Sequence, residues 1–358
     1  MNHRRWIATA GLLVAAGLAA GCATTPYPLP LHGETEMTLQ LEDGEAQIER
    51  GKPNAWIDGF GHYFFSLYSK LLLLSWKVNN HNVPDEVVKD LETYLHANGL
   101  CNVKVRINQY APGGEWRRLF RNEEMPAGWR YTIGVVSVTI YTIIPARLFA
   151  GFPIPFVGGG GDSYNPFTNT VSIYSGSRPI ALHEGGHVKD LAEKENRHWK
   201  GAYAGLRAIP FVGIPFTLWQ EGVASSDALS WDLATASSGE SKAAYRLLYP
   251  AYGTYVGGSA ASVAQFWLPD WWMQYAIQFG AVVVGHVTGQ TRALFEKERA
   301  EGLEPVLAQM SACPGFAAEM GETQAPEAPP SDAVPSETEP LPVTPAPDEV
   351  EPDPGVMP

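Results

Sequence analysis

Hydrophobic residues recur at helical spacing between residues 83 and 100. They stand at Val87, Val88, Leu91 and Leu95, so one face of a helix over this stretch is apolar. The next ten residues alternate instead, with Val103, Val105 and Ile107 on one side of an extended chain. This change of period predicts a helix that is followed directly by a strand.

Between residues 165 and 236 the sequence predicts a strand that is followed by two helices. Residues 165–176 combine a turn with an alternating β-branched run, and a helix is predicted to follow through 181–190. Residues 207–219 are apolar with two prolines and predict a linker, and 220–236 predict a second helix. We therefore expect the α+β class, mostly helical, with a small edge sheet beside the 181–190 helix.

Other long stretches are strongly apolar. Residues 51–82 predict an apolar helix, and the segment from 244 to 302 predicts a helical hairpin that turns at Pro269 and Asp270. Pairs of glycines four residues apart, Gly253/Gly257 and Gly285/Gly289, let helices approach closely. We expect tight packing on the rest of the domain, and membrane insertion of 254–291 is the alternative.

The run Leu-His-Glu-Gly-Gly-His contains the spacing His-Glu-x-x-His. On a helix, His183 and His187 lie on one face and can share one metal ion. Zinc suits imidazole ligands, and Glu184 would then stand beside the open position as the general base. Gly185 and Gly186 each cost about 1 kcal/mol in a helix, and we expect close approach of the edge strand or of substrate to offset that cost. A metal-free pair of histidines is the alternative.

Such a site needs a third ligand. The metzincin pattern fails, because position 190 is Asp and position 193 is Glu. The segment Trp-Gln-Glu-Gly-Val-Ala offers Glu221 in the first turn of the second predicted helix. Asp190 and His198 remain rival ligands.

The segment from 165 to 236 contains a predicted strand, the His-Glu-x-x-His helix and a helix that carries Glu221. This arrangement resembles that of gluzincin-type zinc metallopeptidases. The resemblance implies a zincin-like domain in which His183, His187 and Glu221 hold zinc and Glu184 is the base. Many gluzincins place Asp four residues after the third ligand, where it orients a ligand histidine. Ser225 occupies that position here, so we expect either Ser225 or Asp227 to orient the histidine.

A peptidase also needs a hydrogen-bond donor near the carbonyl oxygen of its substrate. His286, Tyr252 and Tyr255 are the candidates, and packing roles in the core are the alternative for each. We expect a peptide or protein substrate to bind extended along the strand at 170–175.

The first 22 residues resemble a bacterial lipoprotein signal. A basic start with Arg4 and Arg5 precedes a short apolar stretch that ends in Leu-Ala-Ala-Gly-Cys at Cys22. Ala19 stands where such signals usually have Leu, and an ordinary signal peptide cut near Ala20 is the alternative. The resemblance implies that Cys22 carries lipid and anchors the protein to a membrane.

Ala23 after the cysteine resembles the pattern that directs lipoproteins to the outer membrane, facing the periplasm. If Cys22 is acylated, Cys101 and Cys313 could form a disulfide in this oxidising compartment, and two separate thiols are the alternative. The sequence does not predict an oligomeric state. The expected organisation is a signal peptide (1–21), a lipidated cysteine and tether ending in a short strand (22–50), a zincin-like domain (51–318) and a tail (319–358).

Charge is unevenly distributed. The formal net charge is -13, but from Glu319 to the end the chain has ten acidic and no basic residues. This proline-rich tail has too little apolar bulk to offset its ordering entropy, and we expect it to be disordered. The remainder is only mildly acidic and has no basic surface, so we expect no nucleic-acid partner.

These observations predict a zinc-dependent metallopeptidase of the cell envelope. Two other classes of function stay open: a non-proteolytic scaffold or chaperone lipoprotein with a relic metal site, and an amide hydrolase acting on cell-wall material. The second performs the same chemistry on a different substrate, so only substrate profiling separates it from a peptidase.

Overall fold

The computed structural model describes residues 39–151, 153–154, 158–159, 161–267 and 270–297. The predicted signal peptide, the acylation site at Cys22, Cys313 and the acidic tail lie outside the described residues. Within the described part, the protein is mostly helical and contains a small four-stranded mixed sheet. At this level the α+β prediction is confirmed.

The four-stranded sheet has the order β1-β2-β6-β5. Strands β1 (Ile48–Arg50), β2 (Lys104–Ile107) and β6 (Thr170–Ile173) are parallel, whereas β5 (Ser163–Asn165) pairs antiparallel with β6. The strand predicted after the 83–100 helix is thus confirmed as β2. The segment predicted as a tether ends in β1, which forms one edge of this sheet.

Strand β6 is an inner strand, which corrects one prediction. Its residues pair with β2 on one side and with β5 on the other. Because the backbone groups of an inner strand are already used, an extended peptide cannot pair along 170–175 as expected. The edge strand on this side is β5, a segment with too little alternation to be recognised in the sequence.

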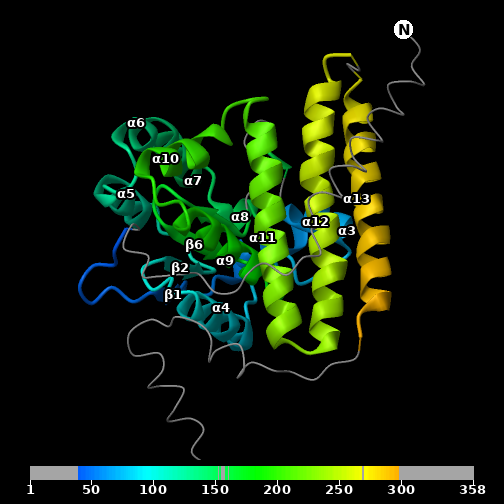
Figure 1. Ribbon diagram of the computed structural model, residues 1–358, viewed down its shortest axis with the longest axis horizontal. Helices are drawn as coiled ribbons and strands as arrows, with labels where there is room; N and C mark the ends of the chain where they lie inside the picture. The colour runs from blue at the N-terminus through cyan, green and yellow to red at the C-terminus, as the bar shows by residue number, and fades with distance from the viewer. Residues whose placement is uncertain (1–38, 152, 155–157, 160, 268–269, 298–358) are drawn as a thin grey trace, which may run out of the picture. The chain divides into compact units, whose positions relative to one another are not determined.

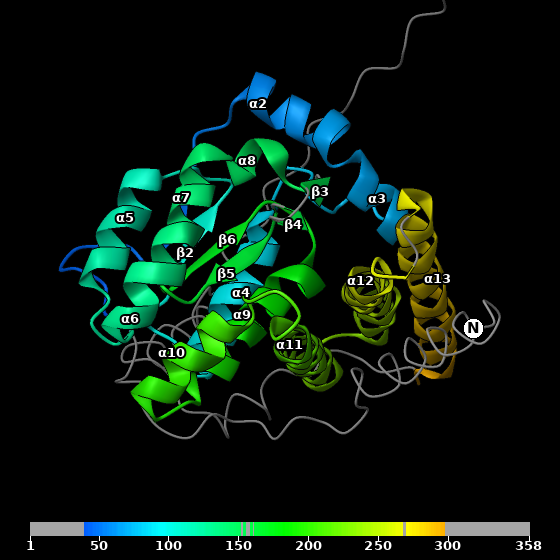
Figure 2. The same ribbon diagram turned by 90° about the horizontal axis from the view of Figure 1, so that it is seen from above.

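Helices cover both faces of the sheet (Figure 2). Val105, Ile107, Val171 and Ile173 pack with apolar residues of α4 (Asp85–Ala97) and α9 (Arg178–Ala192) in the main core. On the other face Arg106 donates from Nε to Glu115 on α5 (Pro112–Arg121) at 2.8 Å. Both faces are therefore buried, and β2 carries buried charged side chains beside its apolar ones.

Asp162 fixes the connection between β6 and α9. One carboxylate oxygen accepts the backbone N–H groups of Tyr174 at 2.7 Å and Ser175 at 2.9 Å. The Ser175 hydroxyl donates to the other oxygen. Pro179 then falls in the first turn of α9, where its missing N–H costs nothing. These contacts set where the chain leaves the sheet and begins the helix of the His-Glu-Gly-Gly-His run.

Three long helices, α11 (Gly213–Thr235), α12 (Ser238–Ala264) and α13 (Trp271–Phe295), lie side by side (Figure 1). Helix α11 begins at Gly213, so most of the predicted 207–219 linker is helical instead. Pro215 falls in the first turn, which explains why a proline did not end this helix. The predicted hairpin is α12 and α13, which end and begin on either side of 265–270.

The glycines of the hairpin lie where α12 and α13 touch. A Cβ atom on Gly253 would stand 2.8 Å from the carbonyl oxygen of Ala281, and one on Gly289 would stand 2.4 Å from that of Tyr245. The expected tight packing is therefore present. None of the helices in the described part of the chain is long and apolar enough to cross a membrane.

Shorter elements complete the described part of the chain. The predicted apolar helix of residues 51–82 is a series of shorter helical segments that ends at Leu73, after which Leu74 is left-handed with φ 49°. The remaining elements are α2 (Ala55–Phe60), η1 (Gly61–Phe65), α3 (Leu67–Leu73), α6 (Ala127–Trp129), η2 (Arg130–Gly134), α7 (Val135–Ile143), α8 (Ala146–Phe149), β3 (Pro153–Ile154), β4 (Gly158–Gly159) and α10 (Arg197–Leu206).

Candidate metal centre

Helices α9 and α11 bring two histidines and one glutamate together. The Nε2 atoms of His183 and His187 lie 3.1 and 3.3 Å from the same oxygen of Glu221. One ligand atom from each residue lies within 4.8 Å of the others, so a single ion could contact all three. The two histidines are 8% exposed and Glu221 1%. The structure thus contains a buried His/His/Glu group at metal-binding distance.

The two glycines between the histidines permit close packing of other helices. A Cβ atom on Gly186 would stand 2.9 Å from the backbone of Ala224 in α11, and one on Gly185 would stand 2.6 Å from the ring of Tyr94 in α4. The expectation that the edge strand or substrate offsets the cost of these glycines is therefore wrong. Gly186 lets α11 approach α9 closely enough for Glu221 to reach both histidines.

Ser225, one turn after Glu221, lies beside the first histidine. Its hydroxyl is 3.2 Å from Nδ1 of His183, the ring nitrogen that faces away from Glu221. Asp227 does not orient a histidine, so this alternative is wrong. It accepts a hydrogen bond from Lys189 Nζ at 2.7 Å and another from the Tyr94 hydroxyl. Six residues beyond Glu221, Asp227 faces a different partner on α9, whereas Ser225 remains near the His183 ring.

Burial and mutual charge shift the pKa values of the group. Burial alone would lower the pKa of His183, but its hydrogen bond to Glu221 and the charges of Glu184 and Glu221 raise it above its ordinary value. Burial lowers the pKa of His187. Burial opposes ionisation of Glu221, yet His187, His183 and Arg207 hold its pKa well below 4.5. A carboxylate whose ionised form is favoured, placed beside two imidazoles, is an electrostatically favourable donor set for a cation.

Glu184 points into the same buried region. It is 6% exposed, and burial raises its pKa to about 8 although the His183 charge opposes the shift. The nearby charges of Glu221 and Asp162 contribute to the rise. A carboxyl group with this pKa is a stronger proton acceptor than an exposed glutamate.

Arg207 is a residue of this site that sequence reasoning missed. It directly follows α10, and its guanidinium donates to the second oxygen of Glu221 at 3.2 Å and to Gln220 at 3.2 Å. This contact leaves the first oxygen of Glu221 to the histidines. Arg207 lies in the segment predicted as a linker, and nothing in the sequence indicated that it would contact Glu221.

Of the three candidate donors for transition-state stabilisation, Tyr255 is the one near the cluster. Glu221, then burial, then Glu184 raise its pKa well above 10, and its hydrogen bond to Glu221 acts in the same direction. Tyr255 as a whole is still 38% exposed. A phenol that meets carboxylates at one end and an open face at the other could contact a substrate.

The other predicted donors and ligands lie elsewhere. The Tyr252 hydroxyl donates to the carbonyl oxygen of Leu218 at 3.3 Å, and His286 Nε2 lies 2.8 Å from the carbonyl oxygen of Leu72. These contacts do not involve the three candidate ligands, and the predicted catalytic roles of Tyr252 and His286 stay predictions. Among the described residues the group at metal-binding distance contains neither rival ligand. His198 is exposed, and Asp190 accepts from Lys194 and Tyr203.

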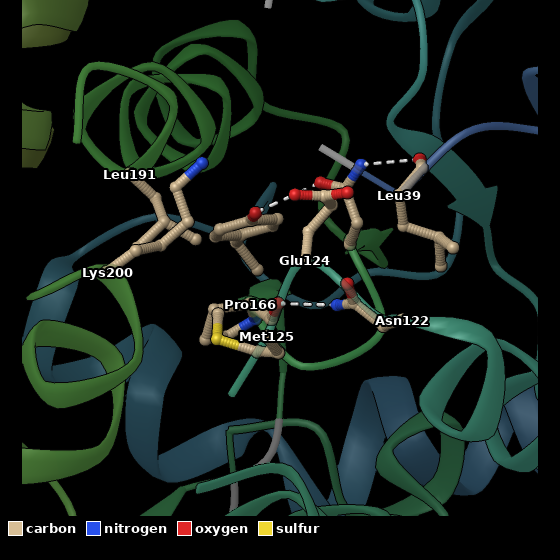
Figure 3. Close-up of a pocket in the computed structure, with 9 residues that line it drawn as sticks. Leu39, Asn122, Glu124, Met125, Pro166, Leu191 and Lys200 are labelled. Carbon is tan, nitrogen blue, oxygen red and sulfur yellow. Dashed lines mark hydrogen bonds between the residues drawn. The ribbon is translucent and has the colours of Figure 1, made fainter. Parts of the chain in front are cut away.

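Two pockets lined by described residues have none of the three candidate ligands in their walls. A pocket of about 10 Å³ next to Lys200 and Leu191 has room for about one water molecule (Figure 3). A cleft of about 630 Å³ opens at the start of α9, with Asp90 and Arg178 in its wall. We therefore assign the candidate chemistry to the residue group rather than to either pocket.

Cys101 is disulfide-bonded. Its predicted partner, Cys313, lies outside the described residues, so the predicted pairing stays a prediction. Comparisons of the chain with protein-family models, with curated proteins and with solved structures find no match.

Proposed function

We propose that the protein is a zinc-dependent metallopeptidase of the cell envelope. The observation that carries the proposal is the buried group of His183, His187 and Glu221, whose ligand atoms lie within 4.8 Å of one another. Arg207 binds one oxygen of Glu221, and the other oxygen, buried beside two imidazoles, is left to contact a cation. Two imidazoles and one carboxylate are also a donor set used by catalytic zinc sites.

Bound zinc would supply a Lewis acid that acidifies a water molecule and polarises a carbonyl group. Glu184 would accept a proton from the attacking water at a carboxylate oxygen and pass it to the nitrogen of the leaving amine. Its burial supports this role, because a desolvated carboxylate holds the proton long enough to deliver it. The raised pKa, about 8, is consistent with a group that exchanges a proton near neutrality.

Three neighbouring side chains would support this chemistry. Arg207 holds the outer oxygen of Glu221 at 3.2 Å and so fixes which oxygen faces the histidines. Ser225 lies 3.2 Å from His183 Nδ1 and would set the orientation of that ring. Tyr255 would donate its proton in a hydrogen bond to the carbonyl oxygen as negative charge develops there.

The substrate would be a peptide or protein. Strand β5 is the edge of the sheet on the side of α9, and the described ladders pair it with β6 alone. An extended peptide could pair with its outer edge and pass the candidate site. The location in the envelope follows from the resemblance of residues 1–22 to a lipoprotein signal, with Cys22 as the membrane anchor.

Elemental mass spectrometry on the full chain, purified without chelators, tests the metal centre first. About one zinc per chain is expected, and Glu221→Ala should remove it. Glu184→Gln is the matched variant, because it should retain zinc while abolishing cleavage of a peptide library. Gly59→Ala is the control that should retain zinc, because a Cβ atom there has nothing within 4 Å.

Absence of zinc after reconstitution with excess zinc would overturn the proposal. Zinc binding with equal peptide cleavage by wild type and Glu184→Gln would also contradict it, since the base would then be dispensable. Zinc with no cleavage of peptides, but Glu184-dependent release of products from isolated cell wall, would assign the same site to cell-wall amides.

A further inference from the structure

An apolar stripe runs along the outside of α2, η1 and α3. Trp56 is 78% exposed and Tyr63 72%, although aromatic side chains of this size usually lie in the core. The exposed apolar residues recur every three or four positions, which places them on one side of the helical segments. They are Trp56, Phe60, Tyr63, Phe64, Leu67, Leu71, Leu74 and, just beyond α3, Trp76.

A second stripe of the same kind runs along α13. Its exposed members also follow helical spacing, while Ala281, Gly285 and Gly289 on the opposite side pack against the protein. From Trp271 to Thr291 the helix has no charged residue. The exposed apolar residues are Trp272, Tyr275, Phe279, Val283, Val287 and Leu294.

The two stripes meet where α3 packs against α13, at one end of the array of long helices (Figure 2). The Tyr68 hydroxyl donates to Gln278 at 3.0 Å, and His286 Nε2 lies 2.8 Å from the carbonyl oxygen of Leu72. The polar groups of both helices therefore pair with each other at this junction. We call the two stripes together the aromatic face.

The two charged residues between Trp56 and Trp76 are Asp58 and Lys70, and both have partners within the protein. Arg147 binds Asp58 with Nε–Oδ1 at 2.8 Å, and Lys70 is buried, with its Nζ donating to the carbonyl oxygen of His62 at 2.7 Å. An exposed apolar surface of this extent is unusual for a soluble monomer and indicates a contact surface.

We propose that the aromatic face lies on a phospholipid bilayer, with its aromatic side chains at the level of the headgroups. Trp and Tyr favour the membrane interface because one end of each ring is apolar and the other is polar. An amphipathic helix of this kind lies in the plane of the interface. The described helices are too short or too polar to cross the bilayer, which agrees with a contact on its surface.

The length of chain before the described residues favours a bilayer over a second copy of the protein. The predicted acylation site, Cys22, precedes Leu39 by 17 residues, which span at most about 60 Å when fully extended. The choice of a bilayer rests on that predicted anchor. An anchored chain would hold the aromatic face close to lipid and raise the effective concentration of the contact.

Hydroxyl-radical footprinting of the full chain on vesicles tests this proposal. The vesicles contain phosphatidylethanolamine and phosphatidylglycerol at a large excess of lipid over protein. Peptides that carry Trp56, Phe64 and Phe279 should be protected by about fivefold or more relative to those that carry Phe120 and Trp199, exposed aromatic residues of α5 and α10. The Phe64→Glu/Phe279→Glu variant should lose this protection, and Phe120→Glu should keep it.

Equal reactivity of the aromatic face and the control residues on vesicles would overturn the proposal. Protection that grows with protein density, accompanied by crosslinks from α13 of one chain to α13 of another, would identify a second copy as the occupant and overturn it as well. The wild-type footprint decides between these outcomes even if a variant fails to fold. Because the readout involves neither zinc nor cleavage, failure of the proposed peptidase activity would leave it unchanged.

Discussion

Helices α9 and α11 share two buried clusters of acidic and basic groups, and the clusters differ in how they are neutralised. In the first, Glu221 faces the imidazoles of His183 and His187 at 3.1 and 3.3 Å. In the second, six residues further along each helix, Asp227 faces Lys189 at 2.7 Å. The surroundings are equally buried, so the difference lies in the bases.

An ammonium group and a phenol complete the second cluster. Lys189 supplies a full positive charge and the Tyr94 hydroxyl donates to the second oxygen of Asp227, so no ligand is needed. Imidazoles are neutral over much of the physiological range and have lone pairs to offer. In the first cluster Arg207 binds one oxygen of Glu221, so the other oxygen and the imidazole nitrogens are donor atoms available to a cation. Burial of a carboxylate alone does not distinguish structural clusters from functional ones.

The largest effect should come from breaking the Asp227 cluster. Asp227→Ala removes the carboxylate that faces the buried Lys189 ammonium group and should lower the free energy of unfolding by about 3–5 kcal/mol. Glu221→Gln should cost far less, since the Arg207 guanidinium that loses its ion pair is 33% exposed and keeps access to water. Urea denaturation of both variants without metal measures the contrast, and equal destabilisation would contradict the assignment of two different roles.

A third acidic residue of α11, Asp232, is intermediate between Glu221 and Asp227 in how fully its carboxylate is paired. Asp232 binds Arg178, but one of its oxygens has no hydrogen-bond partner within the described region. Burial raises the pKa of Asp232 to about 7, although Arg178 opposes the shift. Between pH 4 and 7 the unfolded chain would lose this proton while the folded chain keeps it, so stability should fall as pH rises across that window.

The change should approach about 1.4 kcal/mol per pH unit at most, the value for one proton. Comparison of wild type with Asp232→Asn in denaturation experiments at pH 4.5 and pH 7 isolates the contribution. The variant should lose less stability over this interval than wild type. A larger loss in the variant would show that the pKa of Asp232 is lowered on folding.

Gly186→Ala should weaken both clusters together. The new methyl group would meet the Ala224 backbone at 2.9 Å and force α9 and α11 apart, at a cost of about 1–3 kcal/mol. Since Glu221 reaches the histidines only across this contact, zinc affinity should fall as well. Gly59→Ala is the control, because a Cβ atom there has nothing within 4 Å. Unchanged zinc affinity in Gly186→Ala would show that zinc binding does not depend on the distance between α9 and α11.

The smallest effect concerns the orientation of His183. Ser225→Ala removes the hydroxyl at 3.2 Å from Nδ1 and should weaken zinc binding by about tenfold with little change in stability. Ser225→Asp should restore or strengthen binding, because a carboxylate accepts the Nδ1 proton more strongly. Competition with a chromophoric chelator measures both affinities. Equal affinity in all three proteins would show that Ser225 leaves the ligand ring unaffected.

Local periodicity predicted the elements in which apolar residues recur on one face. The 3.6-residue period at Val87, Leu91 and Leu95 gave α4, and the two-residue period at Val103, Val105 and Ile107 gave β2. Where both faces of an element are buried, apolar residues stand on both faces, and their period predicts the type and ends of the element less well. Helix α11 starts earlier than expected for this reason, since its first turns read as an apolar linker.

Within the candidate site, the spacing of His183 and His187 was predictable because it depends on one helix alone. Glu221 was predictable from its place in a second helix, and Ser225 from its distance to Glu221. Arg207 and the true partners of Asp227 were not, and neither was the choice of Tyr255 among the three candidate donors. They reach their positions through the packing of α10, α12 and α4, whose mutual geometry leaves no mark on sequence spacing.

The sequence by itself determined which side chains share a helical face, because covalent geometry repeats every 3.6 residues. It determined the pair of histidines, the neighbouring base and the carboxylate that could join them. Tertiary structure decided which acids on α11 meet an imidazole and which meet an ammonium group. It also decided that β6 is covered on both edges and that the apolar stripes face outward. These outcomes depend on contacts between segments far apart in the chain, where backbone approach at positions such as Gly186 sets the distances.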